Sequence, residues 1–283
     1  MTNMLIGKNE ILKFLSDPFD IKVLEAAFRN LDDTTNPIRF NNFAYVLREL
    51  VNRVIDRLAP NKEVIESKWW KPSLDDKIAN KANRRQQIRY ALLDGNPEDF
   101  VIQKLEIDVD EIADYVYECI GRLNKFTHIS SAYFGCPEKE IPLRVSEACS
   151  TITNLFGTIW QCRDKIAEGI MDLIDDDLVE SLYLDTYDEL DILSTHSSIE
   201  EYYIDDYKIT PLSEGVISCI TTGNVQARLQ YGSDGDQRRG NGMVTSMEFP
   251  FTAEFTCRLC EEGIVDYEVV KASISIDTDS FYE

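Results

Sequence analysis

The chain has 283 residues, of which 43% are hydrophobic and 10% aromatic, so it is long enough for two domains and can bury a substantial core. This composition excludes a disordered chain. The formal net charge of −22 repels phosphate at long range, so any nucleic-acid binding would have to come from a local basic patch.

Neither a membrane segment nor an export signal is predicted. No apolar run approaches the roughly 20 residues that a spanning helix needs, and the first residues, MTNMLIGKNE, lack a signal-peptide pattern. The seven cysteines are an odd, scattered set: Cys119, Cys136, Cys149, Cys162, Cys219, Cys257 and Cys260. In a chain without an export signal this is typical of reduced, buried thiols. We therefore expect a cytoplasmic protein that contacts no membrane.

The first part of the chain has the apolar periodicity of helices. The pattern predicts helices over residues 9–31, 38–59, 84–93, 97–104, about 108–128 and about 143–174. Pro18 suits a helix start, and Asp108 is a plausible N-cap for the helix that follows it. Residues 61–83 are less regular, and Trp69-Trp70-Lys71-Pro72 is typical of a loop. An all-helical domain over residues 1–180 is therefore predicted.

The character of the chain changes after this helical part. Residues 172–206 contain thirteen Asp or Glu and no Lys or Arg, and within them we place an acidic linker at 181–199. Polar and apolar residues then alternate with the period of two that half-buried strands show. Strand-like runs cover 203–209, 216–220, 225–229, 249–259 and 265–276. We predict an α+β chain in which residues 200–283 form a small antiparallel β domain, a sandwich or a barrel, that senses or binds a partner.

One group of residues that could carry chemistry lies at the end of the helix 108–128. Asn124 and Lys125 lie four and three residues before His128, so these three share a helix face, and Arg122 lies about a third of a turn away. A neutral imidazole can take the proton of an RNA 2′-hydroxyl or give one to the leaving oxygen. A guanidinium can hold the phosphate. The alternative, favoured by the residues alone, is a helix-end histidine with one structural hydrogen bond.

A second group is the basic segment, residues 68–90. Its seven cations, set against Asp75 and Asp76, give a local charge of +5: Lys68, Lys71, Lys77, Lys81, Arg84, Arg85 and Arg89. Trp69, Trp70 and Tyr90 interleave them, so bases could stack while cations hold phosphates. A solvated surface loop with a tryptophan anchored in the core fits equally well. The residues singled out for nucleic-acid contact are Lys68, Lys71, Arg84, Arg85 and Arg89.

Other patterns favour structural roles. Glu49 could orient a catalytic residue on a neighbouring helix, although an acid at such a position is more often solvated. The segment 230–242 has Asp234 and Asp236, as a calcium loop would, but it lacks the terminal bidentate glutamate, so we expect an ordered hairpin loop. The single CxxC at 257–260 has no second pair of zinc ligands nearby. We expect neither a metal nor a cofactor.

Six blocks, in order along the chain, resemble the predicted pPIWI-associating nucleases of bacterial defence loci. They are FAYVLRELVNRVIDRLAP at 43–60, WWKP at 69–72, NRRQQIRYALLDGNPEDFV at 83–101, RLNKFTHIS at 122–130, VQARLQYGSDGDQRRGNG at 225–242 and MEFPF at 247–251. The resemblance implies a helical nuclease-like domain followed by a β domain.

The segment from Arg122 to His128 also resembles the RxxxxxH spacing of HEPN ribonucleases, which are helical dimers that cleave RNA without a metal. That family typically has a polar residue directly after the arginine. Here Leu123 occupies that position and Asn124 follows one residue later, which affects the assignment of Arg122 more than that of His128. Lys125 is the alternative cation.

These resemblances imply an anti-phage defence effector, a toxin that cleaves RNA without a metal. His128 would be its acid–base group, and Arg122 with Asn124 or Lys125 would hold the scissile phosphate while the basic segment guides RNA. Because HEPN sites form between two protomers, a homodimer is implied. The alternative is a catalytically inert sensor or adaptor that binds a phage component or a partner effector encoded in the same defence locus. An acidic surface suits a basic protein partner.

Overall fold

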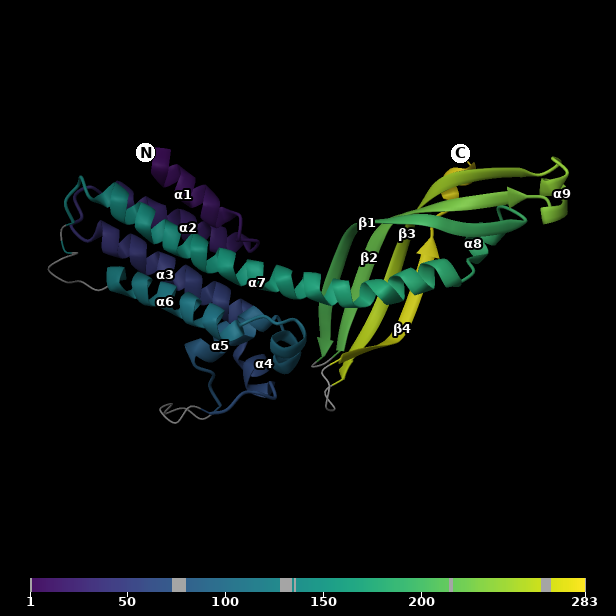
Figure 1. Ribbon diagram of the computed structural model, residues 1–283. Coiled ribbons are helices and arrows are strands. Elements are labelled where there is room, and N and C mark those ends of the chain that lie inside the picture. The colour runs from purple at the N-terminus through teal and green to yellow at the C-terminus, as the bar shows by residue number, and fades with distance from the viewer. Residues whose placement is uncertain are drawn as a thin grey trace. The chain divides into compact units, whose positions relative to one another are not determined.

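The protein is described by a computed structural model that covers residues 2–72, 80–127, 134, 136–213, 216–260 and 266–282. It is an α+β chain with helices in its N-terminal half and a four-stranded antiparallel sheet in its C-terminal part (Figure 1). Two compact units form, residues 1–98 with 106–165 and residues 99–105 with 166–283. None of the described helices combines the length and the apolarity that crossing a membrane requires.

Nine α-helices are found in the described ranges: α1 Thr2–Leu12, α2 Pro18–Arg29, α3 Arg39–Leu58, α4 Asn61–Glu66, α5 Arg84–Leu93, α6 Val109–Thr127, α7 Ile141–Leu184, α8 Asp188–Asp191 and α9 Asp234–Arg238. The predicted bounds of α5 are confirmed, and those of α3 and α6 differ by about one residue. The helix expected at 9–31 is two helices, because Pro18 begins α2 and the Asp17 carboxylate accepts a hydrogen bond from the Phe19 N–H at 2.6 Å. The short helix expected at 97–104 is a π-type turn, Phe100–Lys104.

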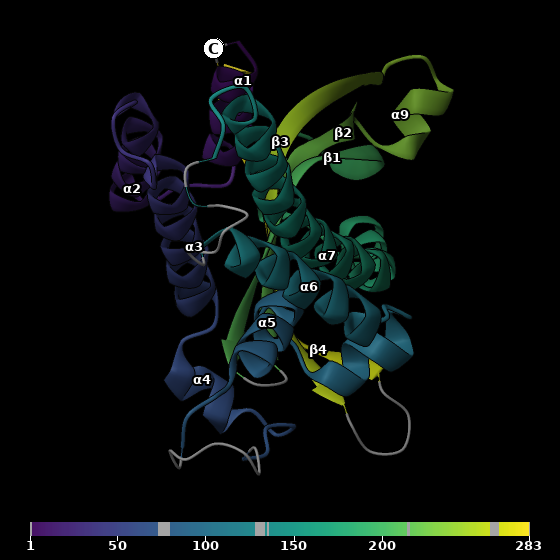
Figure 2. The same cartoon turned by 90° about the vertical axis from the view of Figure 1, so that its left-hand side faces the viewer.

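The core of the first unit forms around α3. Its apolar side chains recur at the helical period, and Phe43, Leu47, Leu50 and Val54 are all fully buried. Helix α3 packs against α2 and α6, and α6 packs in turn against α5. The helix of the predicted catalytic residues therefore lies beside the helix of the basic segment (Figure 2).

A buried carboxylate fixes α2 against α3. Asp20 is fully buried, accepts a hydrogen bond from Arg53 Nε at 3.0 Å and forms a second ion pair with Arg57. Both arginines stay partly in water, with 45% and 38% of their side chains exposed. Because an unpaired buried carboxylate is costly, the two helices are held in the register that brings these cations to Asp20.

The second unit contains a β-meander in the order β1-β2-β3-β4, with each strand antiparallel to the next. The strands are β1 His196–Ser213, β2 Val216–Tyr231, β3 Met243–Cys260 and β4 Asp266–Ile276. The runs expected at 216–220 and 225–229 are therefore parts of one long strand. Alternate residues along β2 are buried, so the sheet has one covered face and one open face.

Helix α7 covers the buried face of the sheet with its C-terminal part (Figure 1). Residues 166–184 of this helix belong to the second unit, and Met171, Ile174 and Leu178 among them are buried. The Cys219 thiol and the Thr221 hydroxyl of β2 both lie 3.8 Å from the Met171 sulfur. The hydrophobic core of this unit therefore lies between one helix and one sheet.

The sandwich or barrel expected for the β domain is wrong, because the described strands form a single open sheet. A sandwich needs a second sheet, and a barrel needs the first strand to pair with the last. Here β1 and β4 stand at opposite ends of the strand order. The alternating pattern correctly reported one buried face, but it could not report that a helix covers that face.

The acidic segment expected to be a linker, residues 181–199, holds the end of α7, all of α8 and the start of β1. Tyr187 and Leu190 within it are buried. The predicted domain limits of 1–180 and 200–283 stay predictions. The covered face of the sheet gives a physical reason to test a boundary near residue 166 as well.

We expect the Asp20→Ala variant to unfold more readily than the wild type, by about 2–3 kcal/mol, because two charge-assisted hydrogen bonds are lost from a buried position. Urea unfolding of the full chain measures this difference. Glu66→Ala is the matched control, because the Glu66–Lys62 pair is exposed and loose at 3.9 Å. A loss of less than about 0.5 kcal/mol for Asp20→Ala, equal to that of the exposed control, would contradict the role assigned to Asp20.

Fragments of the chain test the boundary of the second unit. We expect residues 166–283 to unfold cooperatively in urea, because this fragment keeps the helix that covers the sheet. The fragment 199–283 lacks that helix and exposes Val225, Phe249 and Phe255 to water, so it should aggregate or unfold without cooperativity. Equally cooperative unfolding of the two fragments would show that the sheet does not need α7.

Candidate functional site

Helix α6 carries the described part of the predicted catalytic group. Asp108 caps its first turn by accepting a hydrogen bond from the Glu111 N–H at 3.0 Å. Val116 and Leu123 of its apolar stripe are fully buried, which fixes the orientation of the helix. The helix extends to Thr127. His128 lies outside the described residues, and its catalytic role is therefore a proposal.

Arg122, Asn124 and Lys125 do not form one cluster. Arg122 pairs with Glu118 one turn earlier, with its Nη2 2.9 Å from a carboxylate oxygen, and this pairing raises the pKa of the guanidinium. Asn124 lies about 200° further round the helix. It lines a pocket whose walls include neither Arg122 nor Lys125 among the described residues. Lys125 is exposed.

This pocket, called here the three-helix pocket, is formed by side chains of α3, α5 and α6. Its volume is about 330 Å³, and its walls are Arg48, Asn52, Arg84, Tyr117, Ile120, Gly121 and Asn124. One residue of the predicted catalytic group, Asn124, and one of the predicted nucleic-acid contacts, Arg84, therefore meet in one cavity. At Gly121 a Cβ atom would have no neighbour within 4 Å, so the cavity is open there.

Arg48 is a charged residue of this pocket that sequence reasoning missed. Its guanidinium pairs with Glu49 at 2.9 Å, lies over the ring of Tyr45 and donates a hydrogen bond to the Thr127 hydroxyl at 3.3 Å. Glu49, considered from the sequence as an orienting acid, thus holds an arginine at the end of α6. The only sequence signal for Arg48 is that position 48 borders the apolar stripe of α3. The packing of α3 on α6 is what brings Arg48 to Asn124.

Each arginine predicted to contact nucleic acid has a carboxylate partner. The pairs are Arg84 with Asp56 at 3.0 Å, Arg85 with Asp114 at 2.7 Å, and Arg89 with Glu98 at 2.7 Å and with Asp110. The charge counted along the sequence is therefore offset in space by carboxylates of other elements. Lys68 and Lys71 are exposed.

The tryptophans of the basic segment are anchored. Trp69 and Trp70 are half-buried and pack against a small cluster of buried residues that includes Ala59 and Val64. The Trp70 ring N–H donates a hydrogen bond to the Gln86 amide oxygen at 3.2 Å. These contacts match the structural alternative for this segment, and its role in nucleic-acid binding stays a prediction.

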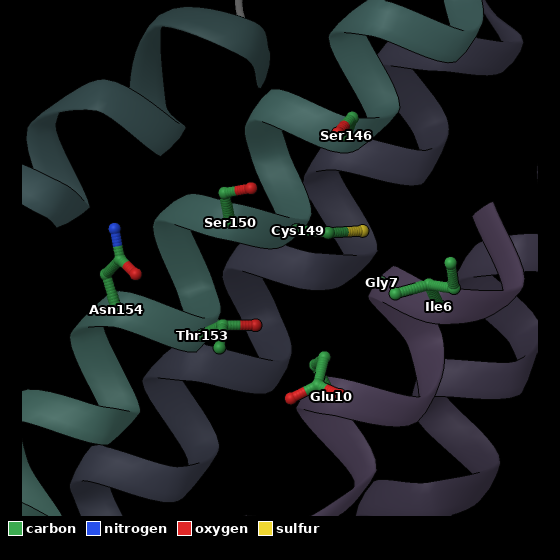
Figure 3. A pocket seen from close by; sticks show the side chains of 8 residues that line it. All are labelled: Ile6, Gly7, Glu10, Ser146, Cys149, Ser150, Thr153 and Asn154. Atoms are coloured by element: carbon green, nitrogen blue, oxygen red, sulfur yellow. The ribbon is translucent and has the colours of Figure 1, made fainter. Parts of the chain in front are cut away.

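A second pocket, of about 230 Å³, lies between α1 and the first part of α7 (Figure 3). Cys149 lines it, and burial raises the pKa of this thiol to about 12, which makes it a poor nucleophile at neutral pH. A Cβ atom on Gly7 would lie only 2.9 Å from the Cβ of Cys149. The pocket therefore borders a close helix crossing, and nothing in it points to a reaction.

Among the residues with described side chains, the remaining cysteines and acidic residues form no second site. The six cysteines with described side chains are free thiols, and all except the partly exposed Cys136 are buried, as expected. No cluster of His, Cys, Asp and Glu placed to hold a metal occurs in the described ranges. The segment 230–242 is the ordered hairpin loop predicted for it, with α9 at its centre.

The fold and this pocket define an α+β protein in which a helical unit with a polar, arginine-lined cavity is followed by a helix-covered open sheet. Two family models match the chain, one over residues 12–152 and one over residues 159–282, and both are described as predicted pPIWI-associating nuclease. The chain belongs to this family of predicted nucleases, so the resemblance found in the six blocks is confirmed. Searches of curated proteins and of solved structures gave no match.

Two neighbouring arginines on α5 separate a structural role from a binding role. We expect Arg89→Ala to lower the free energy of unfolding by about 2 kcal/mol, because its guanidinium is 20% exposed and bonds two carboxylates. Arg85→Ala should cost less than about 1 kcal/mol, because the Arg85–Asp114 pair is exposed at 59% and 65%. Urea unfolding gives both values. Equal losses would contradict the structural assignment of Arg89.

Proposed function

We propose that this protein is a metal-independent endoribonuclease of anti-phage defence whose reaction centre lies at the C-terminal end of α6. Membership of a predicted nuclease family supports a nuclease role. The observation that carries the proposal is the three-helix pocket, because it gathers Arg48, Arg84 and Asn124 from three helices. Guanidinium and amide groups are the donors that hold a phosphate and its developing charge.

In the proposed reaction, His128 takes the proton of the 2′-hydroxyl and the 2′-oxygen attacks the neighbouring phosphorus. The bond from phosphorus to the 5′-oxygen breaks, this oxygen takes a proton from water as it leaves, and His128 then returns its proton to the solvent. The products are one RNA end with a 2′,3′-cyclic phosphate and one with a 5′-hydroxyl. Thr127, the residue before His128, accepts a hydrogen bond from Arg48, so a cation is held at this end of α6.

The predicted phosphate contacts on α6 lie on different sides of this helix and form two groups. Asn124 faces the pocket together with Arg48, so these two are assigned to the phosphate that the 2′-oxygen attacks. Arg122 pairs with Glu118 away from the pocket walls. If the active form is a homodimer, Arg122 and Lys125 are available to the site of the other protomer, as sites shared between protomers require.

Cleavage of a labelled single-stranded RNA in EDTA tests the proposal. We expect His128→Ala to lower the rate by 10²-fold or more, because it removes the acid–base group. Arg48→Gln should lower the rate about tenfold by removing a charge from the phosphate site. Gly121→Leu should also lower it, because the new side chain fills the pocket from a position where a Cβ meets no neighbour.

The control variant is Arg29→Gln, which removes an exposed arginine outside the proposed site and should cleave at the wild-type rate. Circular dichroism and urea unfolding establish that all four variants are folded. Equal rates for the wild type and His128→Ala, or no cleavage by either, would contradict the proposed function.

A catalytically inert adaptor is the second candidate function. It is favoured by the carboxylate partners of Arg84, Arg85 and Arg89, which lower the positive charge available to RNA. An acidic chain of net charge −22 would attract a basic partner protein. Affinity purification from cells that carry the whole defence locus discriminates between the two functions. A stoichiometric partner without RNA cleavage favours the adaptor, and cleavage by the purified chain alone favours the nuclease.

A further inference from the structure

Helix α9 lies at the tip of the β2–β3 hairpin, in the second unit (Figure 1), and this tip carries a group of charged residues. We call it the hairpin cluster and define it as His196, Arg228, Asp234 and Arg238, supported by Gln230. His196 of β1 is paired with Gln230 of β2, which lies two residues after Arg228. The strand register therefore brings His196 close to Arg228, although the two are 32 positions apart in the sequence. Ser198 is paired with Arg228 in the same way. Since side chains alternate across a strand, His196, Arg228 and Gln230 share one face of the sheet.

A buried amide holds two of the charged groups. Gln230 is 5% exposed, and its Nε2 donates hydrogen bonds to Asp234 Oδ1 at 2.9 Å and to the Gly232 carbonyl at 3.2 Å. Its Oε1 accepts a hydrogen bond from Arg228 Nη2 at 3.3 Å. Both Arg228 and Asp234 are thereby positioned before any ligand arrives, which lowers the entropy cost of binding.

The loop that presents Arg238 is also fixed in place. Ser233 and Asp236 form a capping box at the start of α9. The Gln237 amide donates hydrogen bonds to the Tyr231 carbonyl at 3.0 Å and to the Met243 carbonyl at 3.1 Å, so it ties the two strands together. A Cβ atom on Gly242 would lie 2.3 Å from that amide, so only glycine leaves room for this tie.

The cations of the hairpin cluster differ from those of the first unit. Arg228 and Arg238 form no ion pair with any residue in the described ranges, whereas Arg84, Arg85 and Arg89 each have a carboxylate partner. Arg239, next in the chain, is held by Asp236 at 3.6 Å and by the Gly235 carbonyl at 2.9 Å.

The charge of the hairpin cluster is positive in a strongly acidic chain. Arg228 and Arg238 against Asp234 leave a formal charge of +1, while the whole chain carries −22. The hydrogen bond from Gln230 lowers the pKa of the Asp234 carboxyl. Asp234 and Arg238 lie four residues apart on α9 and so share one face of it, and His196 is the cross-strand partner of Gln230. Electrostatic interactions with His196, Arg238 and Arg228 lower the pKa of Asp234 further.

We propose that the hairpin cluster is a phosphate-binding site, in which Arg228 and Arg238 hold the anionic oxygens and His196 donates a further hydrogen bond. Its ligand is a phosphate group carried by a nucleic-acid strand or by a nucleotide. Arginine matches phosphate geometry with two parallel N–H donors. Arg228 and Arg238 interact with Asp234 electrostatically but form no ion pair among the described residues, so no ion pair is lost when a phosphate arrives. This site is separate from the three-helix pocket and does not depend on the proposed cleavage.

Binding of a fluorescein-labelled single-stranded DNA to the full chain tests this site. The DNA lacks the 2′-hydroxyl, so the proposed cleavage cannot consume it. We expect Arg238→Gln to weaken binding about tenfold and to reduce the slope of log affinity against log salt by about one unit. Arg239→Gln is the matched control, because this neighbouring arginine is also exposed and already bonds Asp236. It should change affinity less than about twofold.

Inorganic pyrophosphate supplies the second arm of the experiment and identifies the source of the phosphate. Binding of DNA that depends on Arg238 supports a nucleic-acid ligand. Binding of pyrophosphate with the same dependence, without DNA binding, supports a nucleotide ligand. Equal effects of Arg238→Gln and Arg239→Gln on both probes, or no binding of either probe, would overturn the proposal. The exposed position of Arg238 keeps this variant folded, and circular dichroism checks that.

Discussion

Burial of two apolar faces by a single helix is the constraint on which the structure depends. Helix α7 is 44 residues long. Val145, Ile152 and Phe156 of its first part are fully buried in the first unit, and Leu178 of its last part is fully buried in the second. The four-stranded sheet has one apolar face and no second sheet to cover it, so the last turns of this helix supply what the sheet lacks. Residues of this one helix therefore take part in both cores.

The pairing of basic side chains with carboxylates is the second constraint on the structure. In a chain with 51 acidic and 29 basic residues, a cation can find a carboxylate almost anywhere on the surface. The arginines of α3 and α5 do so, and Asp20 shows that this pairing also reaches the core. A cation without such a partner is therefore more informative here than a cation in a basic run of sequence. The hairpin cluster contains two such cations, because Arg228 and Arg238 have no ion-pair partner among the described residues.

Much of the secondary structure could be predicted from the sequence, because its signals are local. Pro18 and Asp108 act within one turn of the helix they begin, and the alternation along β2 reports its own burial. The open sheet could not be predicted, because the alternation along a strand shows that one face is buried but does not show whether a helix or a second sheet covers it. The run of carboxylates predicts a linker at 181–199, and charge along a segment does not reveal that Tyr187 and Leu190 within it are buried.

The candidate site was predictable only in part for the same reason. Asn124 and Arg84 were singled out separately, and only the packing of α5 and α3 on α6 shows that they share a pocket with Arg48. Spacing along α6 suggested that Arg122 would act with Asn124, but a helix turns about 200° over two residues, which places them on different sides. The sequence of one helix determines on which side of that helix each residue lies. The residues of a site come from neighbouring helices as well.

The central claim is that RNA is cleaved by attack of its own 2′-hydroxyl, at the end of α6. Mass spectrometry of the RNA ends produced by the purified protein tests this most directly, because attack by the 2′-oxygen and attack by water leave different termini. The account predicts 2′,3′-cyclic phosphate ends paired with 5′-hydroxyl ends, formed in EDTA and absent with His128→Ala. Ends carrying a 5′-phosphate and a 3′-hydroxyl would contradict it, because they require water or another nucleophile to attack in place of the 2′-oxygen.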